Sequence, residues 1–339
     1  MTFLKKNKYS LAKFLVSVFR KRPYCFSVVL RLNDDCNLRC SYCSSPENDR
    51  EFDFKKLIEY LEKCHSEGCR YAVLTGGEPS MYGHIDGLLD WLEEHDFYVC
   101  MNTNGYSISD KKYRERISRV DEVAISLDGP KIHHDQLRGK GSHFKALKAI
   151  AFSKRIGLKV SISPVLHRFN LSPELIDYFV SLRNNHGLHI DYGIVDHRGD
   201  VTSSETSRSI AIDKKKRQEF FGYLRKAKSK HGLYEISNFT IDYMENPTPQ
   251  KCESSNFVRF VDLTGDISPC MHVAGESWSK VGSVDQFSKN YEENCIDCSY
   301  CSCNPVLVLN NFLKNKYSLL PILRMFFARV LGVIPRARR

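Results

Sequence analysis

The chain has 339 residues, 42% of them hydrophobic, which suffices for a large buried core and excludes a disordered chain. The formal charge of +10 lies at the ends, because residues 1–22 and 305–339 each carry seven Lys or Arg and no acid; residues 23–304 therefore carry −4 and lack the basic groove of a nucleic-acid-binding protein. The 13 cysteines gather at short spacings, which favours metal ligation in a reducing, cytoplasmic compartment over secreted disulfides.

The first 22 residues predict a basic amphipathic helix. Leu11, Phe14, Leu15, Val18 and Phe19 recur at helical spacing among lysines. The apolar run is too short to cross a bilayer and lacks the cleavage site of a secretory signal. Such a helix is typical of an anionic membrane surface, and equally of a helix packed on the body of the protein.

Three cysteines within eight residues follow an apolar run, 26–32, that predicts a strand. Cys36, Cys40 and Cys43 are spaced C-x3-C-x2-C. Three thiolates this close can hold three irons of one [4Fe-4S] cubane and leave the fourth iron open to a small molecule. A zinc knuckle or a set of buried thiols is the alternative interpretation.

Strand-like and helix-like segments alternate along the first two thirds of the chain. This alternation predicts a parallel sheet, and six βα units suit an open barrel whose chemistry gathers at the carboxyl ends of the strands. The six expected strands are 26–32, 71–75, 97–102, 121–127, 158–163 and 188–194.

The loop after the second expected strand reads Thr75-Gly76-Gly77-Glu78-Pro79. Its two glycines permit positive φ and close backbone approach, and Glu78 with nearby backbone groups can receive an ammonium. A plain strand-to-helix turn is the alternative.

The next strand ends also carry polar residues. Asn104 follows the third strand and Ser126 begins the Ser-Leu-Asp-Gly end of the fourth, although both stretches are also ordinary turn sequences. Arg138, within His134–Gly139, can pair with a carboxylate through its fork of donors.

Cysteines return after the basic, helix-like stretch 214–230. A predicted strand at 257–263 and a turn at 264–266 form a hairpin that brings Cys252 and Cys270 together. Cys295 and Cys298 add a C-x2-C pair, and these four sulfurs can close a second [4Fe-4S] cubane or hold a zinc ion.

The motif C-x3-C-x2-C, the GGEP loop and six βα units resemble the radical S-adenosylmethionine (radical SAM) superfamily. The resemblance implies a partial (β/α)6 TIM-like barrel in which a cluster on Cys36, Cys40 and Cys43 binds SAM. In that family SAM is cleaved to a 5'-deoxyadenosyl radical that removes a substrate hydrogen atom. The resemblance also implies contacts to SAM from Tyr42, Gly76, Gly77, Glu78, Pro79, Asn104, Ser126 and Arg138.

The later cysteines resemble the SPASM and Twitch auxiliary-cluster extensions of the same superfamily. Cys301 and Cys303 follow too closely for the longer SPASM pattern, so the single-cluster Twitch form fits better. The implied ligands of one auxiliary [4Fe-4S] cluster are Cys252, Cys270, Cys295 and Cys298, with Cys301 a further candidate.

These features predict four parts of the chain. They are a basic amphipathic N-terminal segment (1–22), a radical SAM core barrel (23–235), an auxiliary-cluster domain (236–304) and a basic apolar C-terminal segment (305–339). We hypothesise that the two basic ends form one peripheral membrane platform.

The expected function is radical SAM chemistry on a small-molecule, sugar or lipid-linked substrate, with a flavodoxin or ferredoxin-type electron donor. The His134–Gly139 stretch resembles that of peptide maturases, so a peptide substrate is the alternative. A noncatalytic electron carrier and a zinc-stabilised binding module are further alternatives. Proton loss from an oxidised substrate radical would need a base, for which the candidates are Asp191, Asp196, His197, Asp262 and Asp266.

Overall fold

The computed structural model describes residues 3–43, 49–194, 212–233, 236–248, 250–265, 267–268, 296–298, 309 and 313. The helices in this part of the chain are α1 (Phe3–Arg20), α2 (Phe54–Glu67), α3 (Ile85–Glu94), α4 (Lys111–Ile117), α5 (Lys131–Arg138), α6 (Ser142–Arg155), α7 (Pro173–His186), α9 (Lys214–His231) and α10 (Asn238–Glu245). The strands are β1 (Ser27–Arg31), β2 (Tyr71–Thr75), β3 (Tyr98–Thr103), β4 (Glu122–Ile125), β5 (Lys159–Ile162), β6 (Val165–Leu166), β7 (His189–Ile190), β8 (Gly193–Ile194), β9 (Gln250–Cys252), β10 (Val258–Val261), β11 (Ile267–Ser268) and β12 (Ile296–Cys298). Short 3-10 helices lie at η1 (Pro79–Met81), η2 (Tyr106–Ser109) and η3 (Ser254–Asn256).

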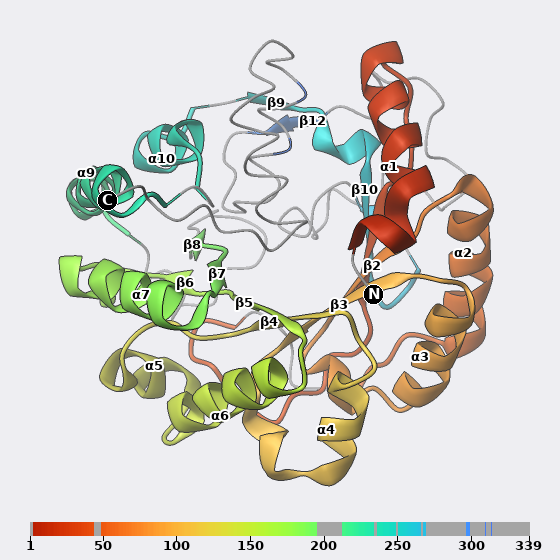
Figure 1. Cartoon of the computed structure of the whole chain (residues 1–339), viewed down its shortest axis with the longest axis horizontal. Coiled ribbons are helices and arrows are strands. Elements are labelled where there is room, and N and C mark those ends of the chain that lie inside the picture. The colour runs from red at the N-terminus through yellow and green to blue at the C-terminus, as the bar shows by residue number, and fades with distance from the viewer. Residues whose placement is uncertain are drawn as a thin grey trace.

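One large sheet organises the described residues. Its strand order is β11-β10-β1-β2-β3-β4-β5-β7, and every neighbouring pair is parallel except β10 and β11. The helices that connect the parallel strands lie along one face of the sheet, which curves around an interior (Figure 1). The predicted α/β class, with the parallel sheet of a partial barrel, is confirmed.

The last predicted strand, 188–194, is wrong as one strand, because the chain forms two. β7 pairs with β5 in the large sheet, whereas β8 pairs with β6 in a separate two-stranded sheet. Pro164 lies between β5 and β6 and has no N–H to donate, so the ladder changes there. Its carbonyl instead accepts a hydrogen bond from the Gly193 N–H at 2.9 Å.

Local signals in the sequence explain where the helices begin and end. Asp53 caps α2 by accepting a hydrogen bond from the N–H of Lys56 at 2.9 Å. Gly68 ends α2 in the left-handed conformation, with φ of 99°. The buried side of α2 includes Leu57 and Leu61, as the helical spacing of the apolar residues predicts.

The inner face of the sheet is polar near its carboxyl edge. Thr103 points outward, because its Oγ1 lies 2.9 Å from the hydroxyl of Tyr113 on α4, so the preceding residue, Asn102, points inward. Strand register then aligns one inward-facing residue from each of six parallel strands. This inner row is Arg31, Thr75, Asn102, Ala124, Ser161 and His189.

The hairpin predicted around residues 257–266 extends the barrel sheet. β10 pairs in parallel with β1, from Ser27 opposite Val258 to Leu30 opposite Val261, and β11 returns antiparallel to β10. The predicted domain boundary at residue 236 therefore does not separate two sheets, since both strands of the hairpin belong to the main one.

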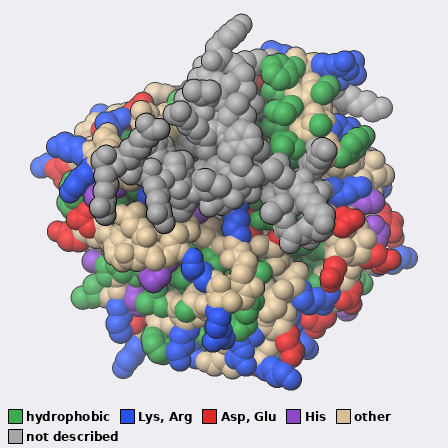
Figure 2. Space-filling view, viewed as in Figure 1, with side chains coloured by type: hydrophobic (Ala, Val, Ile, Leu, Met, Phe, Trp, Pro, Cys, Tyr) green, Lys and Arg blue, Asp and Glu red, His purple; other side chains and the backbone are tan. Residues whose placement is uncertain are grey.

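Helix α1 uses part of its apolar face inside the molecule. Phe14 and Val18 are buried in a cluster that also contains Tyr24, Phe257 and Leu313. Other hydrophobic side chains of α1 are exposed along the helix at the upper right of Figure 2, namely Tyr9, Val16 and Phe19. Among the described residues, none of the helices combines the length and hydropathy needed to cross a bilayer.

Candidate active site

The three predicted cluster ligands lie in the loop that follows β1, at the carboxyl edge of the sheet. Cys36 and Cys40 are half-buried, and Cys43 is exposed. Asn104 reaches this loop from the end of β3. Its Nδ2 donates to Oδ1 of Asn37 at 2.8 Å and lies 3.6 Å from Sγ of Cys36. The structure therefore brings Asn104, a predicted SAM contact, beside the first cysteine.

Burial controls the protonation of these thiols. It raises the pKa of Cys36 above its ordinary value and raises the pKa of Cys40 to about 11. The positive charge of Arg138 opposes the shift in the pKa of Cys40, whereas Cys43 adds to the pKa shifts of both other thiols. Because iron binds the thiolate form, loading this loop with iron releases protons.

The donor set fits an iron-sulfur cluster. In a cubane each thiolate binds its own iron, whereas one tetrahedral zinc ion would draw its sulfurs to within about 4 Å of each other. Within the described ranges, no group of three His, Cys, Asp or Glu side chains is gathered closely enough to hold a single metal ion. Three soft sulfur donors on one loop suit the wider spacing of a cluster.

The GGEP loop packs directly against the start of the cysteine loop. The N–H of Gly77 donates to the carbonyl of Asn33 at 2.7 Å, and the N–H of Glu78 donates to that of Asp35 at 2.8 Å. A Cβ on Gly77 would lie 2.1 Å from the Asp35 carbonyl oxygen, and Gly76 has φ of 151°. The close approach that glycine permits is therefore used between these two loops.

Glu78 joins the ends of β2 and β3. It is 1% exposed; Oε1 accepts from the hydroxyls of Ser80 at 2.7 Å and Thr103 at 2.9 Å, and Oε2 accepts from the N–H of Asn104 at 2.9 Å. Burial raises the pKa of Glu78, and these hydrogen bonds oppose that shift in pKa. Pro79 begins η1. Contact of Glu78 and Pro79 with SAM stays a prediction, and Oε2 retains acceptor capacity for it.

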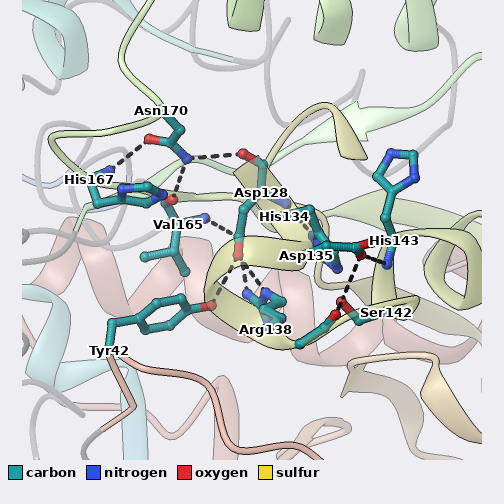
Figure 3. Close-up of polar contacts among 11 residues, drawn as sticks. Tyr42, Asp128, His134, Asp135, Arg138, Ser142, His143, Val165, His167 and Asn170 are labelled. Carbon is teal, nitrogen blue, oxygen red and sulfur yellow. Dashed lines mark hydrogen bonds and ion pairs between the residues drawn. The ribbon is translucent and has the colours of Figure 1, made fainter. Parts of the chain in front are cut away.

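Asp128 is the centre of a buried network at the end of β4 (Figure 3). Its carboxylate accepts hydrogen bonds from Nε and Nη2 of Arg138, from the hydroxyl of Tyr42 at 3.2 Å and from the N–H of Val165 at 2.9 Å. Burial alone would raise the pKa of Asp128, but Arg138 outweighs it and holds this pKa below the ordinary value.

The carboxylate partner predicted for Arg138 is thus supplied by the chain itself. Two nitrogens of its guanidinium bond to Asp128, and its Cζ lies 5.4 Å from the centre of the Tyr42 ring. A direct contact from Arg138 or Tyr42 to SAM stays a prediction. For Arg138, Nη1 is the nitrogen that Asp128 leaves available.

His189 is a polar residue of the barrel interior that the sequence analysis missed. It belongs to the inner row, and its Nε2 lies 3.1 Å from Oδ1 of Asp191, one of the predicted base candidates. Alternation along the last strand would have shown that both residues share a face, had β7 been separated from β8. Ser126 is half-buried, with its N–H donating to the carbonyl of Thr103 at 2.9 Å, and its contact with SAM stays a prediction.

Asp262, another base candidate, has a local role. Its Oδ1 accepts hydrogen bonds from the N–H of Thr264 at 2.9 Å and from the hydroxyl of Thr264 at 2.6 Å, which closes the turn of the β10–β11 hairpin. The base candidates that lie outside the described residues are Asp196, His197 and Asp266.

Two buried histidines beside the Asp128 network predict a pH dependence of stability. Nδ1 of His134 accepts from the N–H of Asp128 at 3.0 Å, and Nδ1 of His167 accepts from that of Phe169 at 3.2 Å. Each neutral ring therefore carries its proton on Nε2, which has no hydrogen-bond partner among the described residues. Burial lowers the pKa of both His134 and His167 to about 4.

The unfolded chain protonates these rings near pH 6.5, whereas the folded chain does so only near pH 4. The free energy of unfolding should therefore fall as the pH falls through this window, by up to roughly 3 kcal/mol for each ring. Urea unfolding of the wild type and of His167→Gln at several pH values checks this, because the variant should depend less steeply on pH. The matched control, His186→Gln, replaces an exposed histidine and should keep the wild-type slope. Equal slopes in all three proteins would refute the prediction.

The predicted auxiliary ligands are described only in part. β9 and β12 pair antiparallel, with Cys252 opposite Ile296 and Cys298 opposite Gln250, so positions 252 and 298 fall on the same face of the ladder. Cys252 is buried. The other predicted or neighbouring cysteines lie outside the described residues, namely Cys270, Cys295, Cys301 and Cys303. The cysteines expected to pack in the core are buried, namely Cys25, Cys64, Cys69 and Cys100.

Comparisons with known proteins match this arrangement. A family model described as the radical SAM superfamily matches residues 30–179. GTP 3',8-cyclase of Clostridium perfringens (strain SM101 / Type A) is 26% identical over 262 residues, covering 72% of this chain and 79% of its own length. GTP 3',8-cyclase of Nautilia profundicola is 23% identical over 249 residues, covering 70% of this chain and 77% of its own.

Solved structures share the fold. Streptococcus suis SuiB bound to precursor peptide SuiA is 17% identical and covers 94% of this chain and 78% of SuiB, with a TM-score of 0.61. The enzyme anSMEcpe with bound AdoMet is 16% identical and covers 92% of this chain and 96% of its own, also with a TM-score of 0.61.

The stretch matched by the family model begins in β1 and ends in α7. It contains the three-cysteine loop, the GGEP loop that braces it and the Asp128 network that holds Tyr42. The fold, these loops at the carboxyl ends of its strands and the family match agree: this chain belongs to the radical SAM superfamily of enzymes.

Proposed function

We propose that Cys36, Cys40 and Cys43 hold a [4Fe-4S] cluster at which SAM is bound and reductively cleaved. The observation that carries this proposal is the placement of three thiols on one loop, joined by backbone hydrogen bonds to the GGEP loop. When bound, the cluster and SAM supply the electron and the 5'-deoxyadenosyl radical that takes a hydrogen atom from the substrate.

The chain's own groups hold and orient these components. Asn104 fixes the start of the cysteine loop through Asn37, and its own N–H donates to Glu78. The carboxylate of Glu78, kept in place by three further hydrogen bonds from Ser80 and Thr103, receives the ammonium group of SAM in this proposal. Fixed donors and acceptors of this kind lower the cost of ordering the cofactor.

The substrate that this interior favours is a polar small molecule, including a sugar or the head group of a lipid-linked compound. The inner row is mostly short and polar, and His189 with Asp191 adds a pair able to accept a proton or a hydrogen bond. Relatives named GTP 3',8-cyclase, which align over 70% and 72% of this chain, support a small-molecule substrate.

A peptide substrate is the second candidate. The structures whose fold matches include SuiB bound to precursor peptide SuiA and anSMEcpe with a bound Cp18Cys peptide. The stretch His134–Arg138, which suggested a peptide maturase, forms part of α5, where His134 and Arg138 both bond to Asp128. These contacts give that stretch a structural role in this chain, so they do not favour a peptide over a small molecule.

An auxiliary [4Fe-4S] cluster on Cys252, Cys270, Cys295 and Cys298 is the third part of the proposal. The pairing of β9 with β12 supports it, because diagonal positions on one face of an antiparallel ladder lie about 7–8 Å apart, which suits ligands of different irons. A cluster there could accept an electron from a substrate radical, giving a net oxidation or a bond-forming cyclisation.

The test of the proposed function is SAM cleavage by the anaerobically reconstituted full chain. With dithionite as reductant, we expect 5'-deoxyadenosine and methionine to form in equal amounts even without added substrate. An iron-sulfur electron carrier would bind a similar amount of iron and release neither product. A zinc-stabilised module would bind zinc in place of iron, so metal analysis of anaerobically purified protein distinguishes the third reading.

The cellular setting follows from the same chemistry. Thiolate-bound clusters require a reducing compartment, so we place the enzyme in the cytoplasm with a flavodoxin or ferredoxin-type donor. Peripheral membrane contact through the basic ends stays a hypothesis that rests on the exposed side chains of α1, because Phe14 and Val18 are already buried.

A further inference from the structure

A buried ion pair lies beside the cysteine loop. The side chain of Asp128 has no exposed surface and that of Arg138 is 8% exposed. Figure 3 shows Tyr42, from the cysteine loop, pointing into this pair. The Tyr42 hydroxyl donates to Asp128 at 3.2 Å, and its ring lies 5.4 Å from the guanidinium carbon of Arg138.

The pair and its helix hold both residues between the second and third cysteines. Tyr42 contacts the pair, and the N–H of Ser41 donates to the carbonyl of Leu137 in the last turn of α5 at 2.9 Å. Cys40 and Cys43 directly flank these two residues. Any movement of the pair would therefore be transmitted to the position of two predicted cluster ligands.

Stability alone is a poor reason for such a pair. Removing two charges from water costs several kcal/mol per ion, and well-packed hydrophobic replacements of buried ion pairs are often neutral or stabilising. In this site the carboxylate of Asp128 accepts from four donors, two of them on Arg138, and its backbone carbonyl accepts from Asn170 at 2.9 Å. The network is fully connected and ends at the cysteine loop.

We infer that Asp128 and Arg138 are positioning residues for the cluster, which fix the segment between Cys40 and Cys43 and keep the net charge beside it at zero. This inference rests on the proposed function, because it requires a cluster on the cysteine loop. It assigns the pair a task that neither its packing nor its contact with SAM would require.

The charge balance has a measurable consequence. Reduction adds one negative charge to the cluster, so a neighbouring positive charge without its partner favours the reduced form. Asp128→Asn leaves Arg138 unbalanced. A unit charge acting over roughly 10 Å through an effective dielectric of about 20 changes the ratio of reduced to oxidised cluster about tenfold. For one electron, a tenfold change corresponds to about 59 mV, here towards higher potential.

The experiment is an anaerobic redox titration of the reconstituted full chain, followed by electron paramagnetic resonance. The signal of this cluster is identified as the one that is missing when all three loop cysteines are replaced. We expect Asp128→Asn to raise its potential and the double variant Asp128→Asn/Arg138→Gln to return it towards the wild-type value. The double variant disturbs the packing more, so a structural effect alone would move it further away.

A matched control removes a charge from the same helix at its exposed end. Lys131 is 67% exposed, and Lys131→Gln should leave the potential unchanged because solvent screens its charge. Equal potentials in the wild type and Asp128→Asn, or a double variant shifted beyond the single one, would overturn the inference while leaving the proposed function intact. Absence of any cluster on the wild-type loop would instead refute the proposed function.

Discussion

Replacement of Cys36, Cys40 and Cys43 together by alanine is expected to abolish SAM cleavage and to remove about four irons from each chain. The reason is that these thiols are the predicted ligands of the cluster at which SAM binds. With the proposed auxiliary cluster, a fully loaded wild type carries about eight irons, so the variant should keep about half of its iron. Iron and sulfide analysis, together with assay of 5'-deoxyadenosine, measures both effects.

The matched control for this experiment is Cys25→Ala, which removes a buried thiol of the barrel core. It should leave the iron content and SAM cleavage close to wild type, at the cost of a modest loss of stability from the small cavity. Iron that stays at the wild-type level in the triple variant would contradict the assignment of the loop. Complete loss of iron in that variant would argue against an independent auxiliary cluster.

Gly77→Ala is expected to destabilise the chain by about 3 kcal/mol or more and to lower the cluster content sharply. The added Cβ would lie 2.1 Å from the carbonyl oxygen of Asp35 and 2.5 Å from that of Asp34. Both obstacles are backbone atoms, so no side-chain rotation relieves the overlap. The loop must move, and it carries the first cysteine one residue later. Urea unfolding and iron analysis of the purified variant test both parts.

Gly222→Ala provides the control, because a Cβ on Gly222 in α9 would have no neighbour within 4 Å. This substitution should stabilise the helix by about 0.5–1 kcal/mol and leave the iron content unchanged. If Gly77→Ala unfolded at the same urea concentration as this control and kept its iron, the close packing of the two loops would not matter for the site.

The fold was largely predictable because its signals are local. The strands β1 to β5 follow apolar or β-rich runs, and the spacing of Leu57 and Leu61 fixes the buried side of α2. The split of the last strand was missed because Pro164, which interrupts the ladder, lies some 25 residues earlier than the segment it affects. The pairing of β10 with β1 depends on contact between distant parts of the chain, which periodicity does not encode.

The site was predictable as a set of loops, but not in its internal contacts. Cysteine spacing and two glycines indicated the chemistry, because few other functions need those residues so close together. The sequence could not show that the fork of Arg138 is taken by Asp128, since ten residues separate them and a turn of unknown shape lies between. Nor could it show that Glu78 is bound by Ser80 and Thr103 before any ligand arrives.

The pairing of β10 with β1 also constrains how the protein is made. Ser27 lies opposite Val258, so a strand that leaves the ribosome early must wait for its neighbour while about 230 further residues are translated. At about 5–20 residues per second, that wait lasts roughly 10–50 seconds. During translation, the segment that bears the first three thiols is therefore attached to a sheet with one open edge. Chaperones and iron-delivery factors meet that edge before the finished barrel covers it.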